Sequence, residues 1–178
     1  MVVQDDATVS GPLISERMRA VLIGAIGYFM LAATTIRLTS DGRNHATVWP
    51  ADAVILALLL KSPKRHWPAI LLAGWAGNLA ANTLTRGWMS GLILYGAINM
   101  AQTWLAAALL TRSGATSNLL ADKRTVIRFF LYAGIVAPLL GAAAGSLVSL
   151  LNYGEPFGLS FLRWYASNAL GLLIVTPL

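Results

Sequence analysis

The sequence contains no cysteine among its 178 residues. This absence excludes a disulfide framework and any metal site built on thiolates. The motifs of common catalytic sites are missing as well, since there is no HExxH zinc motif, no phosphate-binding loop and no GxSxG nucleophile turn. We therefore predict no catalytic residue, no metal site and no cofactor, and we expect that this chain is not itself an enzyme.

Charged residues are scarce, at 11% of the chain, whereas hydrophobic residues make up 57%. A soluble domain usually carries charge on roughly a quarter of its residues. Almost all the ionisable residues fall between apolar runs, so the composition indicates an integral membrane protein surrounded by a lipid bilayer. The formal net charge of +6 then reflects basic residues that orient the chain in the membrane, and we predict no nucleic-acid partner.

The apolar runs predict an all-α fold, a polytopic bundle of six transmembrane helices. Residues 1–17 are polar and lack the basic start and small-residue cleavage site of a signal peptide, so they are predicted to stay as a cytoplasmic segment before a transmembrane domain, 18–178. The second run is short, because a span normally needs about 20 residues and a shorter apolar segment can be re-entrant. The predicted helices are 18–38, 46–61, 67–85, 90–111, 126–151 and 160–178.

Basic residues are distributed unequally between alternate loops, and this orients the predicted bundle. The side with more Lys and Arg is expected to face the cytoplasm. Both ends of the chain are then cytoplasmic, and His45 and His66 lie on opposite sides, where they cannot share a metal ion. The richer side carries Arg17, Arg19, Lys61, Lys64, Arg65, Arg112, Lys123, Arg124 and Arg128, and the poorer side carries Arg37, Arg43, Arg86 and Arg163.

Polar side chains inside the apolar runs are predicted to meet at one depth, in the outer half of the bundle. Asp52 is the acidic residue within a run, where a charge costs about 2.5–3.5 kcal/mol at the bilayer centre. Amides of the third and fourth helices and the first turns of the sixth reach the same depth. The candidate ligand-binding residues are Asp52, Asn78, Asn82, Asn99, Gln102, Arg163 and Asn168, with Trp75 and Trp104 as walls.

Structural interpretations of the same residues compete with a ligand site. Asn and Gln side chains bridge membrane helices. Asp52 is also explained as a carboxylate at a helix start or as an ion partner of Arg163. The aromatic residues near helix ends are expected to form an interfacial belt; they are Trp49, Trp67, Trp88, Trp164 and Tyr153.

Small residues and a proline predict local features of the bundle. Gly141 and Gly145 have the GxxxG spacing of close helix contacts, and Gly74 and Gly77 have a similar role in the third helix. Pro138 is expected to kink the fifth helix, because proline removes a backbone hydrogen bond.

Two stretches of the sequence resemble the first type of bacterial MASE (membrane-associated sensor) domains, over the amino-terminal six helices of such a domain. The first stretch is WPADAV at 49–54, followed by KSPKRHWP at 61–68. The second is FLRWYASNALGLLIVTPL at 161–178, which is similar to the family's aromatic turn, D-x-L-G sequence and terminal VTP. The chain departs from the family at Ala51 and Asp52, where Pro-Gly is common, and at Asn168, where Asp is common.

The resemblance implies a sensory input domain in the bacterial inner membrane that relays a periplasmic or membrane signal to a cytoplasmic output. It implies further membrane helices after residue 178 and then a diguanylate cyclase, a cyclic-di-GMP phosphodiesterase or a histidine kinase. The expected partner is a small ligand or another membrane protein, and the output domain would supply a homodimer contact. The alternative is a six-helix substrate-binding subunit of a vitamin-type transporter, which the length, basic charge and outward polar cluster also suit.

Overall fold

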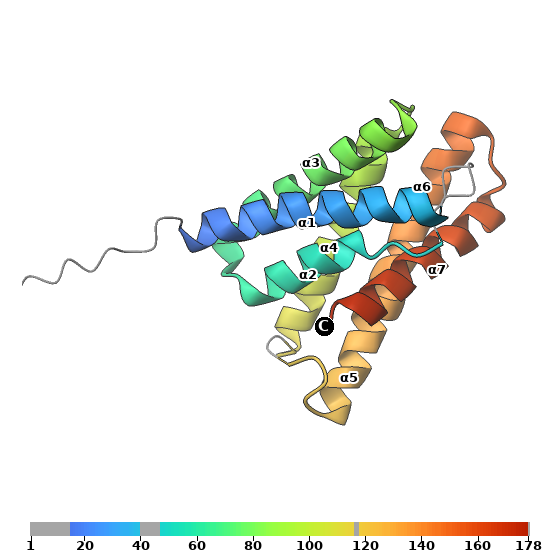
Figure 1. Cartoon of the computed structure of the whole chain (residues 1–178). Helices are drawn as coiled ribbons and strands as arrows, with labels where there is room; N and C mark the ends of the chain where they lie inside the picture. Colours follow the sequence, from blue (N-terminus) through green and yellow to red (C-terminus); the bar gives the residue numbers. More distant parts are fainter. Residues whose placement is uncertain (1–14, 40–46, 116–117, 178) are drawn as a thin grey trace, which may run out of the picture.

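The computed structural model describes residues 15–39, 47–115 and 118–177, and this part of the chain is all helical (Figure 1). Counting the continuous Lys123–Tyr153 segment once, it contains six helical segments longer than ten residues, which agrees with the predicted number of helices. Arg43 and His45 lie outside the described residues. The elements are α1 Glu16–Thr39, α2 Ala51–Lys61, η1 Lys64–His66, α3 Trp67–Arg86, α4 Leu92–Arg112, α5 Lys123–Phe129, η2 Phe130–Val136, α6 Ala137–Tyr153 and α7 Phe157–Val175.

Among the described residues, three helical segments are long and apolar enough by themselves to cross a membrane: Glu16–Thr39, Leu92–Arg112 and Lys123–Tyr153. Large apolar side chains such as Ile26, Leu72, Leu140 and Ile174 lie exposed on the outside of the bundle. Asparagines, serines and a carboxylate are instead buried within it. This inverted distribution is the one expected where lipid surrounds the protein and polar groups must find partners inside it.

Small residues bring neighbouring helices close together, as predicted. α1 and α3 lie side by side (Figure 1), and a Cβ on Gly77 would lie 2.8 Å from the backbone oxygen of Ala25. On α6, a Cβ on Gly145 would lie 2.8 Å from the Trp164 ring, and one on Gly141 would overlap the side chain of Gln102. The prediction that Gly141 and Gly145 mark helix contacts is confirmed.

α2 has 11 residues and a length of about 16 Å, roughly half the thickness of a hydrocarbon core. The predicted start at residue 46 is wrong: Ala46 lies outside the described residues, Thr47 to Trp49 are not helical, and the helix begins at Ala51. The reason is local, because a residue before proline is disfavoured in the helical conformation. The backbone N–H of Trp49 instead donates to the carbonyl oxygen of Ser167 on α7, at 3.0 Å.

The segment Lys123–Tyr153 is one continuous helix that changes its winding in the middle. Residues Phe130–Val136, η2, form a π-helix directly before Pro138, which lies in the first turn of α6. Proline has no N–H to donate, so the backbone hydrogen-bond pattern of the helix is interrupted there, and a π-helical segment accommodates the interruption. The irregularity therefore lies in the turns that precede the predicted kink residue.

Asp122 caps the start of α5, and we expect its removal to loosen that turn. Its Oδ1 accepts from the N–H groups of Arg124 and Thr125 at 2.8 and 3.0 Å, and its Oδ2 accepts from the Thr125 hydroxyl at 2.7 Å. The Thr125 hydroxyl, followed by these N–H groups, lowers the pKa of Asp122. In Asp122→Ala, the two amides should exchange hydrogen several-fold faster in hydrogen-exchange measurements.

The same cap predicts a pH dependence with a defined sign. A carboxylate whose pKa is lowered by folding stabilises above its unfolded pKa, which is about 4, and that stabilisation is lost as the pH falls through the folded pKa. Protection of Arg124 and Thr125 should therefore fall in acid. Asp122→Asn keeps an acceptor oxygen and should remove the pH dependence, whereas equal acid sensitivity in this variant would contradict the assignment.

Candidate functional site

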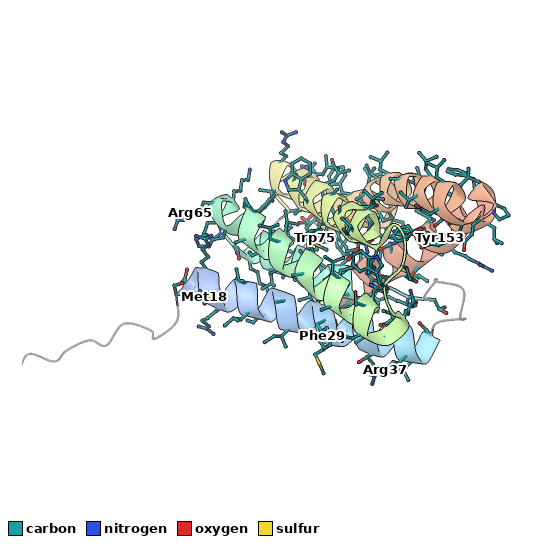
Figure 2. The ribbon with its side chains drawn as sticks, turned by 90° about the horizontal axis from the view of Figure 1, so that it is seen from above. Met18, Phe29, Arg37, Arg65, Trp75 and Tyr153 are labelled. Carbon is teal, nitrogen blue, oxygen red and sulfur yellow. The ribbon has the colours of Figure 1, made fainter. Side chains whose placement is uncertain are left out.

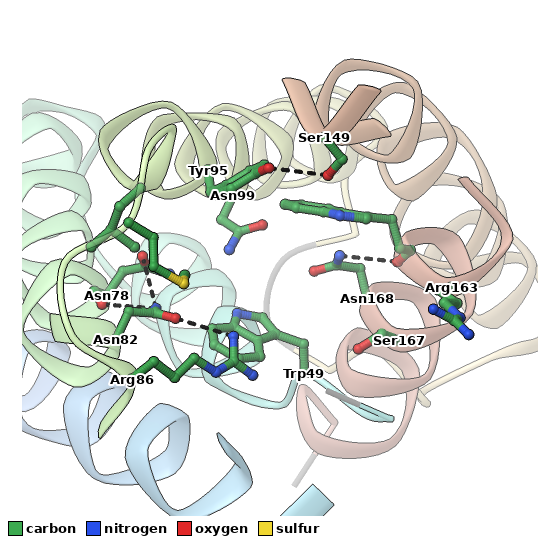
Figure 3. A pocket seen from close by; sticks show the side chains of 13 residues that line it. Trp49, Asn78, Asn82, Arg86, Tyr95, Asn99, Ser149, Arg163, Ser167 and Asn168 are labelled. Carbon is green, nitrogen blue, oxygen red and sulfur yellow. Dashed lines mark hydrogen bonds between the residues drawn. The ribbon is translucent and has the colours of Figure 1, made fainter. Parts of the chain in front are cut away.

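A polar cavity of about 60 Å³ opens where the ends of α3 and α6 meet the first halves of α4 and α7 (Figure 3). A buried water needs roughly 10–15 Å³ measured in this way, so the cavity has room for a few waters or a small solute. Its lining comes from residues 47–50 (the Trp49 segment), from α3, α4, α6 and α7, and from Met89 in the loop between α3 and α4. The lining residues are Trp49, Asn78, Asn82, Arg86, Met89, Leu92, Tyr95, Asn99, Ser149, Arg163, Trp164, Ser167 and Asn168.

Two amide oxygens face into this cavity without a hydrogen-bond partner among the residues that the structure describes. They are Oδ1 of Asn99 and Oδ1 of Asn168, whose side chains are 4% and 3% exposed. Asn168 Nδ2 donates to the backbone oxygen of Trp164 at 3.0 Å, which turns its oxygen toward the cavity, and Figure 3 shows the oxygen of Asn99 across from it. Leaving a buried polar group unpaired costs about 1–3 kcal/mol. A ligand that donates hydrogen bonds to these two oxygens would remove that cost.

Two aromatic side chains, one helical turn before Asn99 and Asn168, form the adjoining part of the cavity wall. The Tyr95 and Trp164 rings lie 5.5 Å apart, and the Tyr95 hydroxyl is hydrogen-bonded to Ser149 Oγ at 3.1 Å. Gly145 lies under the Trp164 ring, where any side chain would collide with it. The wall is therefore held between α4, α6 and α7, and movement of one helix would reposition it.

Tyr28, in the middle of α1, is the centre of the polar network beneath the cavity. Its hydroxyl donates to Asp52 Oδ1 at 2.7 Å. The hydroxyl oxygen of Tyr28 accepts from Trp49 Nε1 at 3.0 Å and from Asn78 Nδ2 at 2.9 Å, and Asn99 Nδ2 lies farther from it, at 3.5 Å. One side chain thus connects α1, α2, α3 and α4.

The network continues along α3 to Arg86 and, on another side of Tyr28, to Gln102 on α4. Asn82 Nδ2 donates to Asn78 Oδ1 at 3.3 Å, and Arg86 Nη1 reaches Asn82 Oδ1 at 3.5 Å (Figure 3). On the other side of Tyr28, Gln102 Nε2 lies 3.5 Å from Asp52 Oδ2. Hydrogen-bonded side chains therefore extend from Arg86 at the cavity to the carboxylate of Asp52, which is completely buried.

The structure brings together most of the residues selected from the sequence. Five of the nine line the cavity: Asn78, Asn82, Asn99, Arg163 and Asn168. Asp52 and Gln102 lie below it in the hydrogen-bonded network. Trp75 and Trp104 lie elsewhere: Trp75 donates to the backbone oxygen of Ile93, and Trp104 lines a separate hollow.

Besides Trp75 and Trp104, sequence reasoning misplaced three more tryptophans, and it missed Tyr28. Tyr28 is a polar residue halfway along the first apolar run, and this was the signal that could have identified it. A single tyrosine, however, has no second polar residue at helical spacing to indicate which way it faces. Trp49 and Trp67 are 8% and 6% exposed, so their assignment to an exposed interfacial belt is wrong. Trp164 lines the cavity, while Trp88 is exposed as a belt residue would be.

Comparison with known proteins gives matches over most of the chain. The MASE1 family model matches residues 18–178. The protein called probable diguanylate cyclase DgcE, from Escherichia coli (strain K12), is 30% identical over 150 residues. That alignment covers 84% of this chain but 13% of the relative, so the chain spans a small part of that protein's length. No solved structure matches.

Proposed function

Because the chain belongs to the MASE1 family, and is therefore a membrane sensory input domain of a signalling protein, we propose that a small solute in its polar cavity controls a cytoplasmic output domain. The observation that carries this proposal is the pair of unpartnered acceptors, Asn99 Oδ1 and Asn168 Oδ1, directly above the Tyr28 network. A solute with N–H or O–H groups would satisfy both oxygens at once.

The proposed topology is six crossings of the bacterial inner membrane, with both ends cytoplasmic. Residues 1–17 form the cytoplasmic start and 18–178 the transmembrane sensory domain, ahead of further helices. Figure 2 supports the alternation, since Met18 and Arg65 lie at one end of the bundle while Arg37 and Tyr153 lie at the other. The polar cavity then opens toward the periplasm, because Arg86 and Arg163 belong to the outer side.

The relay we propose runs through the non-helical Trp49 segment. Trp49 lines the cavity, its indole donates to Tyr28 on α1, and its backbone is hydrogen-bonded to Ser167 on α7. A solute that displaces Trp49 therefore acts on α1, α2 and α7 together. Signalling requires only that the solute bind one of two helix packings more tightly than the other.

The output that we propose first is a diguanylate cyclase, because the similar protein of Escherichia coli carries that printed name. A cyclic-di-GMP phosphodiesterase and a histidine kinase are the other two output classes. The output domain would also be the site of any homodimer contact, and its chemistry would lie outside residues 18–178.

The test is to measure cellular cyclic-di-GMP for the full-length protein carrying Asp52→Ala or Asn168→Ala. Each change removes a polar group from the network or the cavity, so the balance of packings should shift by about 1 kcal/mol and the output about fivefold, with unchanged membrane insertion. Asn118→Ala is the matched control, because Asn118 is exposed and outside the cavity. Unchanged output in both variants would refute the proposal, and solute retained by the isolated chain together with unchanged output would favour the transporter subunit.

A further inference from the structure

A second hollow, of about 300 Å³, lies between α3 and α4 at the end of these helices opposite the polar cavity. Two basic residues, Lys64 and Arg112, lie at its rim, and both are exposed. Apolar and aromatic groups form the rest of the lining, and no acidic residue of the described chain contributes to it. The apolar members are Trp67, Pro68, Leu71, Trp104 and Ala108.

Trp104 is the unusual member of this lining. Its side chain is 49% exposed, and within the described part of the chain its indole N–H makes no hydrogen bond. The neighbouring Trp67, by contrast, is buried and donates to the backbone oxygen of Leu59 at 2.9 Å. An N–H group at membrane depth requires a partner, and an exposed one must find it outside the protein.

The positions of these groups along α4 match the layout of a phospholipid. Trp104 precedes Arg112 by eight residues, so it lies about 12 Å deeper along the helix axis. A phospholipid carries its phosphate at the surface, and its ester carbonyls and acyl chains follow below. Basic groups at the rim and an aromatic N–H donor beneath them present the complementary order.

We propose that this hollow binds an anionic phospholipid of the cytoplasmic leaflet, with its phosphate between Lys64 and Arg112 and its ester and acyl region against Trp104. Charge complementarity selects the occupant, because basic hollows between helices on the cytoplasmic side bind anionic headgroups. The proposal depends on the orientation given above but not on the cavity's role in sensing. Loss of lipid binding would leave the sensing proposal intact, and loss of sensing would leave this one intact.

The experiment uses the full-length protein in phosphatidylcholine vesicles that contain brominated phosphatidylglycerol, which quenches nearby tryptophan fluorescence. The difference between the wild type and Trp104→Phe isolates the Trp104 signal from the other tryptophans. Each basic residue near an anionic surface contributes about 1 kcal/mol, which is about fivefold in affinity. We therefore expect Trp104 to be quenched at a concentration of phosphatidylglycerol five- to thirtyfold lower than that of brominated phosphatidylcholine.

Lys64→Gln with Arg112→Gln should remove this preference and leave Trp104 equally sensitive to both lipids. The matched control is Arg17→Gln with Arg124→Gln, which removes the same charge from exposed positions outside the hollow and should keep the preference. Equal quenching by the two lipids in the wild type would overturn the proposal. An equal loss of the lipid preference in the control pair would also overturn it, because it would indicate general attraction to the leaflet. The same holds if neither lipid quenches Trp104, because protein would then cover the hollow.

Discussion

Replacing Gly171 with alanine is expected to destabilise the folded protein by about 3 kcal/mol or more. Gly171 is buried on α7, and a Cβ there would overlap the carbonyl oxygen of Trp49 and lie 2.5 Å from its carbonyl carbon. The obstacle is backbone, which cannot rotate away as a side chain can. Overpacking in a well-packed interior costs about 1–3 kcal/mol or more, against a total stability of about 5–15 kcal/mol.

The measurement is the thermal midpoint of the detergent-solubilised protein, followed by size-exclusion chromatography. A loss of 3 kcal/mol corresponds to a fall in the midpoint of about 6–12 °C for a chain of this size. Gly158→Ala is the matched control, because it lies on the same helix with nothing within 4 Å of the added Cβ. If Gly171→Ala were as stable as Gly158→Ala, the close passage of the Trp49 segment against α7 would be refuted.

Tyr28→Phe should be the most damaging change of a single oxygen atom in this protein. Tyr28 is completely buried, and its hydroxyl is the partner of Asp52 Oδ1, Trp49 Nε1 and Asn78 Nδ2. Membrane hydrogen bonds average about 0.6 kcal/mol each, and a buried group left unpaired costs about 1–3 kcal/mol, so we expect a loss of about 2–4 kcal/mol. Equilibrium unfolding in mixed micelles of increasing denaturing detergent would measure it.

Tyr132→Phe is the control for this experiment, because Tyr132 is half-buried and its hydroxyl makes no hydrogen bond in the described structure. A double-mutant cycle adds a second criterion. If Tyr28 acts through Asp52, the losses in Tyr28→Phe and Asp52→Asn should be non-additive, with a coupling above about 0.5 kcal/mol. Additive losses would show that the two side chains stabilise the bundle independently.

The amide residues of the cavity could be selected from the sequence because they are polar residues within apolar runs. Asn78 and Asn82 are four residues apart in an apolar run, so one helix face must carry both, and the high cost of exposing polar groups to lipid turns that face inward. The same reasoning placed Asn99 and Gln102 on one face of α4. Both pairs are buried in the structure.

Trp75 and Trp104 show the limit of that reasoning. Trp75 lies three residues before Asn78 and Trp104 two residues after Gln102, yet neither lines the cavity. Apolar aromatic side chains are equally acceptable toward lipid and toward a packed interior, so polarity did not determine the direction of Trp75, whereas Trp104, two residues after Gln102, already lies on another face of α4 by helical spacing. The position of Trp75 follows from where the neighbouring helices lie.

The sequence by itself determined that this protein is a helical membrane domain, how its helices divide the chain and which polar residues must avoid lipid. Hydrophobicity and the cost of unpaired polar groups act locally along each helix, so these properties can be calculated residue by residue. Only the tertiary structure decided that Tyr28 is the centre of the network and that the Trp49 segment runs against Gly171. Both depend on contacts between residues far apart in the chain, Tyr28 with Asn78 and Trp49 with Ser167, and the packing of whole helices creates them.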